Sequence, residues 1–292
     1  MSFDPILNLS SLDGSNGFRL DGAAAFDRSG NSVSSAGDVN GDGFDDLIIG
    51  AGLANNNDSG SSYVVFGKAS GFNATQNLST LDGSNGFRLD GVAADDRSGV
   101  SVSSAGDVNG DGFDDLIIGA NEADPNGNLS GSSYVVFGKA SGFSATQNLS
   151  TLDGSNGFRL DGVAAFDRSG GSVSSAGDVN GDGFDDLIIG VNGADPNGDY
   201  SGSSYVVFGK ASGFNATQNL STLDGSNGFR LDGVAADDRS GVSVSSAGDV
   251  NGDGFDDLII GANEADPNGN LSGSSYVVFG KASGFSATQN LS

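Results

Sequence analysis

One nine-residue segment, Asp-Val-Asn-Gly-Asp-Gly-Phe-Asp-Asp, occurs four times in this chain of 292 residues, starting at Asp38, Asp107, Asp178 and Asp249. The copies are separated by 69, 71 and 71 residues, and the shorter interval reflects one loop that is two residues shorter. A fixed period of this length is typical of proteins built from repeated units that pack on their neighbours. We therefore expect one domain, residues 1–292, made of four repeats of about 71 residues.

Each repeat contains four segments with the pattern of β-strands. In the second repeat they are residues 99–104, 115–120, 132–138 and 157–161. The first and last alternate apolar and polar side chains, as strands with two different faces do. The middle two are short apolar runs, typical of strands covered on both sides, and no segment has the periodicity of a helix. This pattern predicts an all-β fold, a β-propeller of four-stranded antiparallel blades with four blades per chain.

The composition narrows the chemistry that the chain can perform. It has 38 Asp+Glu against 12 Lys+Arg, a net charge of −26, and neither His nor Cys. The acidic balance argues against a nucleic-acid partner, which would need a basic surface. Without His or Cys there are no imidazole bases, thiol nucleophiles, disulfides or usual zinc ligands. No apolar stretch is long enough for membrane insertion, and the N-terminal segment does not have the pattern of a signal peptide.

The nine-residue segment carries oxygen ligands at alternating positions. In the first copy these are the side chains of Asp38, Asn40, Asp42 and Asp46, with the backbone carbonyl of Phe44 between the last two. Ca²⁺ takes six to eight oxygen ligands, and crowded carboxylates repel one another unless a cation lies among them. The segment therefore predicts Ca²⁺ as a cofactor, about four ions per chain. The alternative is an acidic turn that binds no metal.

An EF-hand loop begins with similar residues but requires a different continuation. It needs an acidic ligand near position 12 and a helix after it. Position 12 in this chain is Ile49, within a predicted strand. The EF-hand interpretation is therefore excluded.

Residues 101–120, followed by Ser-Ser-Tyr-Val-Val-Phe-Gly at 132–138, resemble the FG-GAP repeat of integrin α-subunit propellers, and most closely bacterial proteins of such repeats. The resemblance implies that the acidic loop joins the first two strands of each blade and binds Ca²⁺ on one face of the disc. The ligands that it implies are Asp38, Asn40, Asp42, Phe44 and Asp46 in the first repeat, Asp107, Asn109, Asp111, Phe113 and Asp115 in the second, Asp178, Asn180, Asp182, Phe184 and Asp186 in the third, and Asp249, Asn251, Asp253, Phe255 and Asp257 in the fourth.

The number of blades departs from the seven of integrin propellers. The chain begins with a segment, 17–21, that matches the fourth strand of a repeat, and it ends before that strand would follow. This opening strand is expected to complete the last blade and close a four-bladed monomer. The alternative is an eight-bladed ring from two chains, a homodimer, because blades shaped for a turn of about 50° fit about 45° more readily than about 90°.

The repeat pattern favours a non-catalytic function. We expect a Ca²⁺-stabilised binding or adhesion module, extracellular or on the cell surface, with a protein or glycan ligand on loops such as 121–131 and 192–202. The alternative is a structural or engineered scaffold without a specific ligand, since residues 59–150 recur unchanged as 201–292.

An enzyme is the third interpretation, with aspartate pairs as its candidate catalytic groups. These pairs are Asp95–Asp96 and Asp237–Asp238. Two other repeats have Phe26 and Phe166 in place of the first aspartate of the pair. Adjacent side chains on a strand also point to opposite faces, so such a pair would not share a proton. We therefore expect no catalysis.

Overall fold

The computed structural model describes residues 8–55 and 57–291. Residues 1–7, part of the segment where no signal peptide is expected, lie outside the described residues, as do Asn56 and Ser292. The described residues form strands and short 3₁₀ turns. In chain order these are η1 (Leu9–Ser11), β1 (Arg19–Asp21), β2 (Ser32–Gly37), β3 (Asp46–Ala51), β4 (Ser61–Val65), β5 (Thr75–Asn77), η2 (Leu78–Thr80), β6 (Gly86–Asp90), β7 (Ser101–Gly106), β8 (Asp115–Ala120), β9 (Ser132–Val136), β10 (Thr146–Asn148), η3 (Leu149–Thr151), β11 (Gly157–Asp161), β12 (Ser172–Gly177), β13 (Asp186–Val191), β14 (Ser203–Val207), β15 (Thr217–Asn219), η4 (Leu220–Thr222), β16 (Gly228–Asp232), β17 (Ser243–Gly248), β18 (Asp257–Ala262), β19 (Ser274–Val278) and β20 (Thr288–Asn290).

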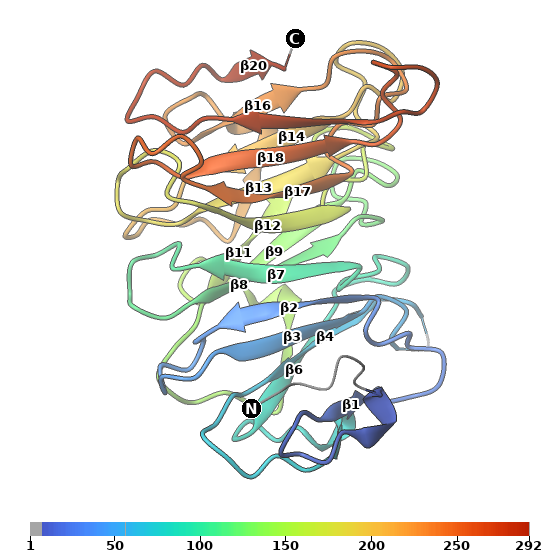
Figure 1. Cartoon of the computed structure of the whole chain (residues 1–292), viewed down its shortest axis with the longest axis vertical. Coiled ribbons are helices and arrows are strands. Elements are labelled where there is room, and N and C mark those ends of the chain that lie inside the picture. Colours follow the sequence, from blue (N-terminus) through green and yellow to red (C-terminus); the bar gives the residue numbers. More distant parts are fainter. Residues whose placement is uncertain (1–7, 56, 292) are drawn as a thin grey trace.

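Each repeat forms one sheet, so the prediction of an all-β fold with four blades is confirmed. The first blade runs β2-β3-β4-β6, the second β7-β8-β9-β11 and the third β12-β13-β14-β16, all antiparallel. The described part of the fourth blade is the three-stranded sheet β17-β18-β19. Figure 1 shows the first strands of the four blades, β2, β7, β12 and β17, one after another along the molecule.

A fifth, parallel strand covers the outer edge of each complete blade. It comes from the following repeat: β10 pairs with β6, β15 with β11, and β20 with β16. The pairing is parallel and joins, for example, Thr146 to Arg88 and Asn148 to Asp90. The side-chain amide of Asn148 also donates to the carbonyl of Gly91 at 3.4 Å. The fourth strand of each complete blade is thus paired on both sides, and consecutive repeats are tied together.

Apolar side chains pack between consecutive blades. The first two blades share a cluster in which Ile48 and Val64 meet Leu116 and Tyr134, and equivalent clusters join the second blade to the third and the third to the fourth. The side chains of Ile48 and Val64 are fully buried. The core is therefore a series of similar layers between sheets, as in other propeller and repeat architectures.

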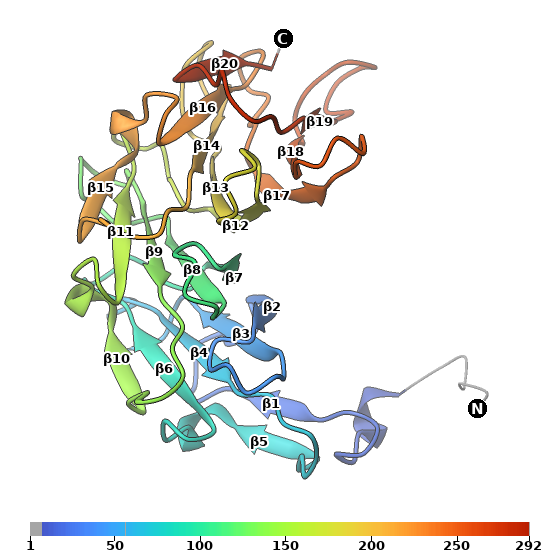
Figure 2. The ribbon, with the colours of Figure 1, turned by 90° about the vertical axis from the view of Figure 1, so that its left-hand side faces the viewer.

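The four blades follow an arc that stays open in this chain (Figure 2). Strand β1, predicted to complete the last blade, pairs instead with β5 through Arg19↔Thr75, Leu20↔Gln76 and Asp21↔Asn77. It lies at the opposite end of the arc from β19. The reason is that β5 pairs in parallel with β1 in the same way as β10 pairs with β6. The ring closure expected from the sequence is thus not formed within the single chain. Among the described residues, no helix is long and apolar enough to cross a membrane.

Candidate metal centre

The four acidic loops join the first and second strands of the blades. The first loop runs from the end of β2 at Gly37 to the start of β3 at Asp46. Its glycines permit a tight path, since Gly41 and Gly43 have φ of +71° and +88°, where a side chain would strain the backbone. The same conformations recur in the other three loops. One local sequence therefore builds the same loop at the same end of every sheet.

Side-chain oxygens hold each loop in shape. The carboxylate of Asp38 accepts hydrogen bonds from the amides of Asp42 at 3.0 Å and Gly43 at 2.8 Å. The side-chain oxygens of Asn40 and Asp42 accept from the amides of Asp42 and Phe44 at 2.9 and 3.0 Å. These bonds are the turns that aspartate and asparagine favour. Three of the predicted ligands in each loop are thus gathered over five residues of folded backbone.

The ninth residue of the segment lies at the base of the loop. Asp46 is fully buried, and its two oxygens accept from the amides of Val39 at 3.2 Å and Gly67 at 2.7 Å. The pKa of this carboxyl is raised to about 7, mainly by burial and to a lesser extent by the carboxylates of Asp42 and Asp38, while the backbone hydrogen bonds act against the rise.

The equivalent carboxyls of the second and third repeats behave in the same way. Burial, opposed by backbone hydrogen bonds and assisted by the neighbouring loop carboxylates, raises the pKa of Asp115 and of Asp186 to about 8. All four residues at this position, including Asp257, are fully buried. Each of the first three loops thus places one carboxyl in a site that disfavours its charge unless a cation is near.

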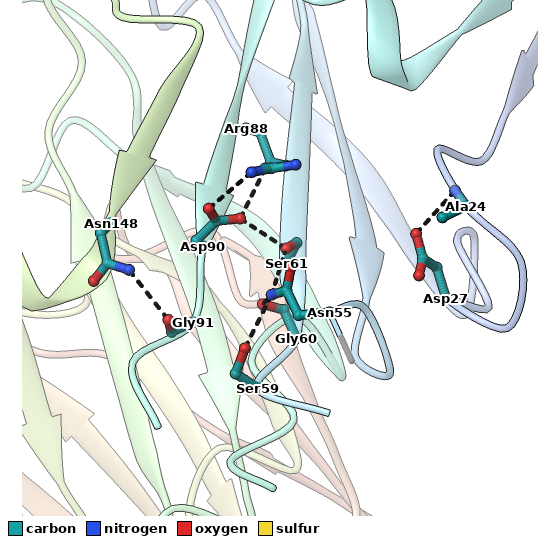
Figure 3. Close-up of polar contacts among 10 residues, drawn as sticks. All are labelled: Ala24, Asp27, Asn55, Ser59, Gly60, Ser61, Arg88, Asp90, Gly91 and Asn148. Carbon is teal, nitrogen blue, oxygen red and sulfur yellow. Dashed lines mark hydrogen bonds and ion pairs between the residues drawn. The ribbon is translucent and has the colours of Figure 1, made fainter. Parts of the chain in front are cut away.

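No lysine or arginine of the described residues forms an ion pair with these loops. Seven arginines form ion pairs elsewhere. Four of them pair with the aspartate two residues along the fourth strand, as in Arg88–Asp90 at 2.8 Å, where Ser61 also donates to the carboxylate (Figure 3). The other three pair with Glu122 or Glu264. The negative charge of the loops is therefore not neutralised by the protein's own cations.

The donor chemistry of the loops fits Ca²⁺. Carboxylate, amide and carbonyl oxygens are the ligands that this ion takes. Within the described residues, no three acidic side chains are gathered closely enough to hold a metal on carboxylates alone. The predicted ligand set of the first loop contains three carboxylates, those of Asp38, Asp42 and Asp46. Its other two ligands are the side-chain amide oxygen of Asn40 and the backbone carbonyl of Phe44. The loop therefore presents suitable donors on a folded backbone, and an ion would have to draw them together.

Hydrogen bonds also connect each loop to the next. The carboxylate of Asp114 accepts from the amide of Asp38 at 2.7 Å, and Asp185 and Asp256 make the same bond to the preceding loops at 2.8 and 2.9 Å. Sequence reasoning gave these residues, at position eight of the segment, no role. Their signal was an acidic residue recurring in all four copies without a place in the ligand set.

Two grooves lie beside the loops. One, of about 710 Å³, is lined by Asn40, Asp42, Lys68, Gln76 and Phe143 among others. The second, of about 730 Å³, repeats this composition two blades along, with Asn180, Asp182, Lys210, Gln218 and Phe285 in its lining. Amide, carboxylate and ammonium groups thus adjoin an aromatic ring on the rim that carries the candidate metal loops.

The aspartate pairs considered for catalysis do not form an acid–base pair. Asp95–Asp96 lies in a turn, so the expectation that such pairs occupy a strand is wrong. Asp95 has φ of +65°, and Asp96 accepts from the amide of Ala93 at 3.0 Å. Asp237–Asp238 has the same arrangement. The second aspartate stabilises the turn.

The two candidate ligand loops differ at three positions, and at one of them the third repeat has an aromatic residue. Tyr200, in loop 192–202, lies under the guanidinium of Arg239 at 4.9 Å, where loop 121–131 has Leu129. The two loops are therefore not interchangeable surfaces.

The repeat profile of one family matches the chain in four places. The FG-GAP repeat matches residues 29–65, 98–136, 169–207 and 240–278, which together make up just over half of the chain. The chain belongs to the FG-GAP repeat family. Each matched segment spans the first three strands of one blade and the acidic loop, so the family repeat and the structural repeat coincide.

Three integrin α-subunits are among the similar proteins. Integrin alpha-V of Gallus gallus is 31% identical over 249 residues, covering 82% of this chain and 21% of the relative. Integrin alpha-PS5 of Drosophila melanogaster is 32% identical over 163 residues, covering 55% of this chain and 14% of the relative. Integrin alpha-4 of Xenopus laevis is 32% identical over 160 residues, covering 53% and 14%. The FG-GAP chain thus spans about a fifth or less of these relatives.

Proposed function

We propose that this FG-GAP protein is a calcium-binding module in which each acidic loop holds one Ca²⁺. In the first repeat, Asp38, Asn40, Asp42 and Asp46 would supply side-chain oxygens and Phe44 its carbonyl, with the equivalent residues in the other three. The bound ion would supply positive charge and crosslink the two ends of the loop.

The observation that carries this proposal is the buried, uncompensated carboxyl at the base of each loop. Asp46 has two backbone donors but no protein cation as partner, and its neighbours Asp38 and Asp42 add like charge. Four divalent ions, one in each loop, would reduce this repulsion and change the net charge from −26 to −18. Binding is therefore expected to stabilise the fold.

Calorimetric titration of chelator-treated protein with Ca²⁺ tests the proposal. We expect about four ions per chain. The variant Asp107→Ala/Asp111→Ala removes two carboxylates from one loop and should lower the number to about three. Its matched control is Asp124→Ala, an exposed turn residue outside the loops that accepts only from the amide of Leu129. Absence of binding by folded wild-type protein would refute the assignment.

We propose further that the module binds a ligand outside the cell, as an adhesion or recognition domain. The two similar grooves beside the loops support this, because their amides, lysine and phenylalanine suit a polar ligand with an apolar face, such as a glycan. Repetition of one groove would give weak sites that act through multivalency. Integrin relatives favour an extracellular place, where millimolar Ca²⁺ fills weak sites.

A glycan array probed with multimeric protein, with and without Ca²⁺, tests this second proposal. Binding that is lost in Lys68→Ala/Lys210→Ala, and kept in Arg97→Ala, whose side chain lines neither groove, would support the two grooves. Binding to no glycan in Ca²⁺ would favour the alternative, a structural scaffold without a specific ligand.

A further inference from the structure

The two ends of the arc expose surfaces that are buried between the inner blades. On the fourth blade, Val250, Ile259 and Val277 are 61%, 38% and 49% exposed, whereas their counterparts in the second blade, Val108, Ile117 and Val135, are 1%, 0% and 0% exposed. On the first blade, Val33 and Leu47 are 65% and 38% exposed, against 5% and 1% for Val102 and Leu116. Each end therefore presents one half of the interface that the chain already makes three times.

The hydrogen bonds of that interface are also missing at the ends. At each inner junction, the aspartate at position eight accepts from an amide of the preceding loop, and a lysine amide donates to a valine carbonyl of that loop, as Lys139 does to Val39 at 3.0 Å. Within the described residues, Asp45 and the amide of Asp249 are not joined in this way, and neither are Lys68 and Val250. These groups lie at opposite ends of the arc. By the pattern of the inner junctions, Asp45 and Lys68 at one end would bond to the amide of Asp249 and the carbonyl of Val250 at the other end.

The strands at the two ends are complementary as well. The fourth blade has three described strands and lacks the one that would pair with β19. Strand β1 has the sequence of that strand and already carries its parallel neighbour β5, but it belongs to no complete blade. Addition of the β1–β5 pair to β19 would produce a five-stranded sheet like the other three.

We propose that two copies of this chain join end to end into a closed ring of eight blades, in which β1 of each copy completes the fourth blade of the other. This inference goes beyond the proposed calcium binding. A second copy fits better than self-closure because the three junctions have equivalent contacts, and this repeated geometry leaves the ends of one chain apart (Figure 2). Two-fold symmetry forms both new junctions at once and covers the open edge of β19 in each copy.

The register of the new junction follows from the first blade. There, Leu89 of β6 lies opposite Ser62 of β4. The corresponding pair is Leu20 on β1 and Ser275 on β19. Because the chain contains no cysteine, the double variant Leu20→Cys/Ser275→Cys reports this contact without background disulfides. Oxidation should produce a covalent dimer with two disulfides. Leu20→Cys/Ser226→Cys is the control, with its second cysteine at an exposed turn of an inner repeat, and should not crosslink.

Each other product of the double variant would overturn the proposal. A disulfide within a monomer would show a four-bladed ring, a ladder of larger species would show an open fibre, and free thiols in folded protein would show that the ends do not meet. The products are separated by mass on non-reducing gels and by mass spectrometry.

Sedimentation of the unmodified chain provides an independent measurement. We expect twice the mass of one chain for the wild type, and dimerisation weakened about tenfold or more by Val277→Asp at the exposed end face. Phe166→Asp is the matched control, since Phe166 is 56% exposed on an inner repeat and two other repeats have aspartate there. It should leave the mass unchanged. A wild-type monomer, or equal effects of the two variants, would overturn the proposal.

Discussion

The aspartate at the ninth position of each loop has two functions in one side chain. Asp115 accepts from the amides of Val108 and Gly138, which ties its loop to the strands on either side. The same carboxyl is buried next to Asp107 and Asp111, so its charge is disfavoured without a cation. In the proposed calcium site, the residue that shapes the loop is therefore also a ligand of the ion.

Protein from which calcium has been removed should lose stability as the pH rises. In the unfolded chain these carboxyls titrate near 3.8, but in the folded chain the pKa values are about 7 for Asp46 and about 8 for Asp115 and Asp186. Between these limits the folded state binds more protons than the unfolded state, so the free energy of unfolding falls with rising pH. Scanning calorimetry should show a Tm lower by about 5 °C or more at about pH 8.5 than at about pH 5.5.

Carboxyls with lowered pKa values do not change the expected loss of stability between about pH 5.5 and about pH 8.5. Hydrogen bonds from the hydroxyl and amide of Ser15 lower the pKa of Asp13, and three equivalent turn residues behave alike. Their stabilisation is lost only as the pH falls below about 4. In saturating Ca²⁺ the decline toward pH 8.5 should disappear, because the ion binds the ionised carboxylates. An equal decline with and without Ca²⁺ would contradict this explanation.

The substitution Asp115→Asn should have an effect that depends on calcium. Without Ca²⁺ it replaces a buried carboxyl with an amide and removes one of two accepted hydrogen bonds, so we expect a change within about 1 kcal/mol. With Ca²⁺ it also removes a ligand, and a site filled at a hundred times its Kd contributes about 2.7 kcal/mol. Urea unfolding in the two conditions measures the difference. Asp124→Asn, at a turn outside the loops, should give the same value in both.

At the scale of elements, the sequence predicts the four strands of a blade closely. The apolar run 115–120 corresponds residue for residue to β8. The first strand is shifted from the predicted 99–104 to Ser101–Gly106, because a register shift between Ser104 and Gly106 carries the pairing to Gly106, whose φ is +71°. Periodicity alone does not reveal such a bulge, since the extra residue breaks the alternation.

The parallel fifth strand could not be predicted from the same pattern. Its sequence, Thr146–Asn148, has no apolar residue and therefore no hydrophobic periodicity. It is held by backbone pairing with Arg88–Asp90 on a different repeat. Because this strand forms mainly by pairing with the free edge of β6, its own residues carry little pattern from which it could be predicted.

Stacked phenylalanine rings hold the loop that precedes each parallel strand. Removing such a ring between two blades should lower the free energy of unfolding more than removing it at the end of the chain. Phe214 stacks on Phe158 at 4.8 Å and meets Phe137 edge-on at 5.2 Å. We expect Phe214→Ala to lower the free energy of unfolding by about 3 kcal/mol. Phe72 has one ring neighbour among the described residues, Phe18 at 4.6 Å, so Phe72→Ala should cost clearly less. Chemical denaturation checks both, and equal costs would contradict this account.

At the scale of the whole molecule, the ring cannot be deduced from the repeats. The ends would close one chain or join two equally well, because β1 has the sequence pattern of the fourth strand of the other blades, β6, β11 and β16. In the structure, the junctions repeat and the arc of one chain stays open (Figure 2), which favours the two-chain ring that we propose. The sequence shows which side chains meet between two blades. The angle between the two sheets depends on how these side chains pack, and this cannot be read from the repeat sequence.

Salt should replace part of the effect of calcium. A net charge of −26 with unpaired acidic loops implies long-range repulsion that dissolved ions screen. Raising NaCl to about 0.5 M should therefore raise the Tm of calcium-depleted protein by about 5 °C and that of calcium-bound protein by less. Thermal scans at two salt concentrations measure this. Equal shifts would show that loop repulsion does not limit stability.

The most direct test of the central claim is to locate the ions. Crystals grown with Ca²⁺, or with Tb³⁺ in its place, should give one anomalous peak in each of the four loops, close to Asp46, Asp115, Asp186 and Asp257. Folded protein whose crystals show no peak in these loops, or peaks only elsewhere on the acidic surface, would contradict the assignment of these loops as calcium sites.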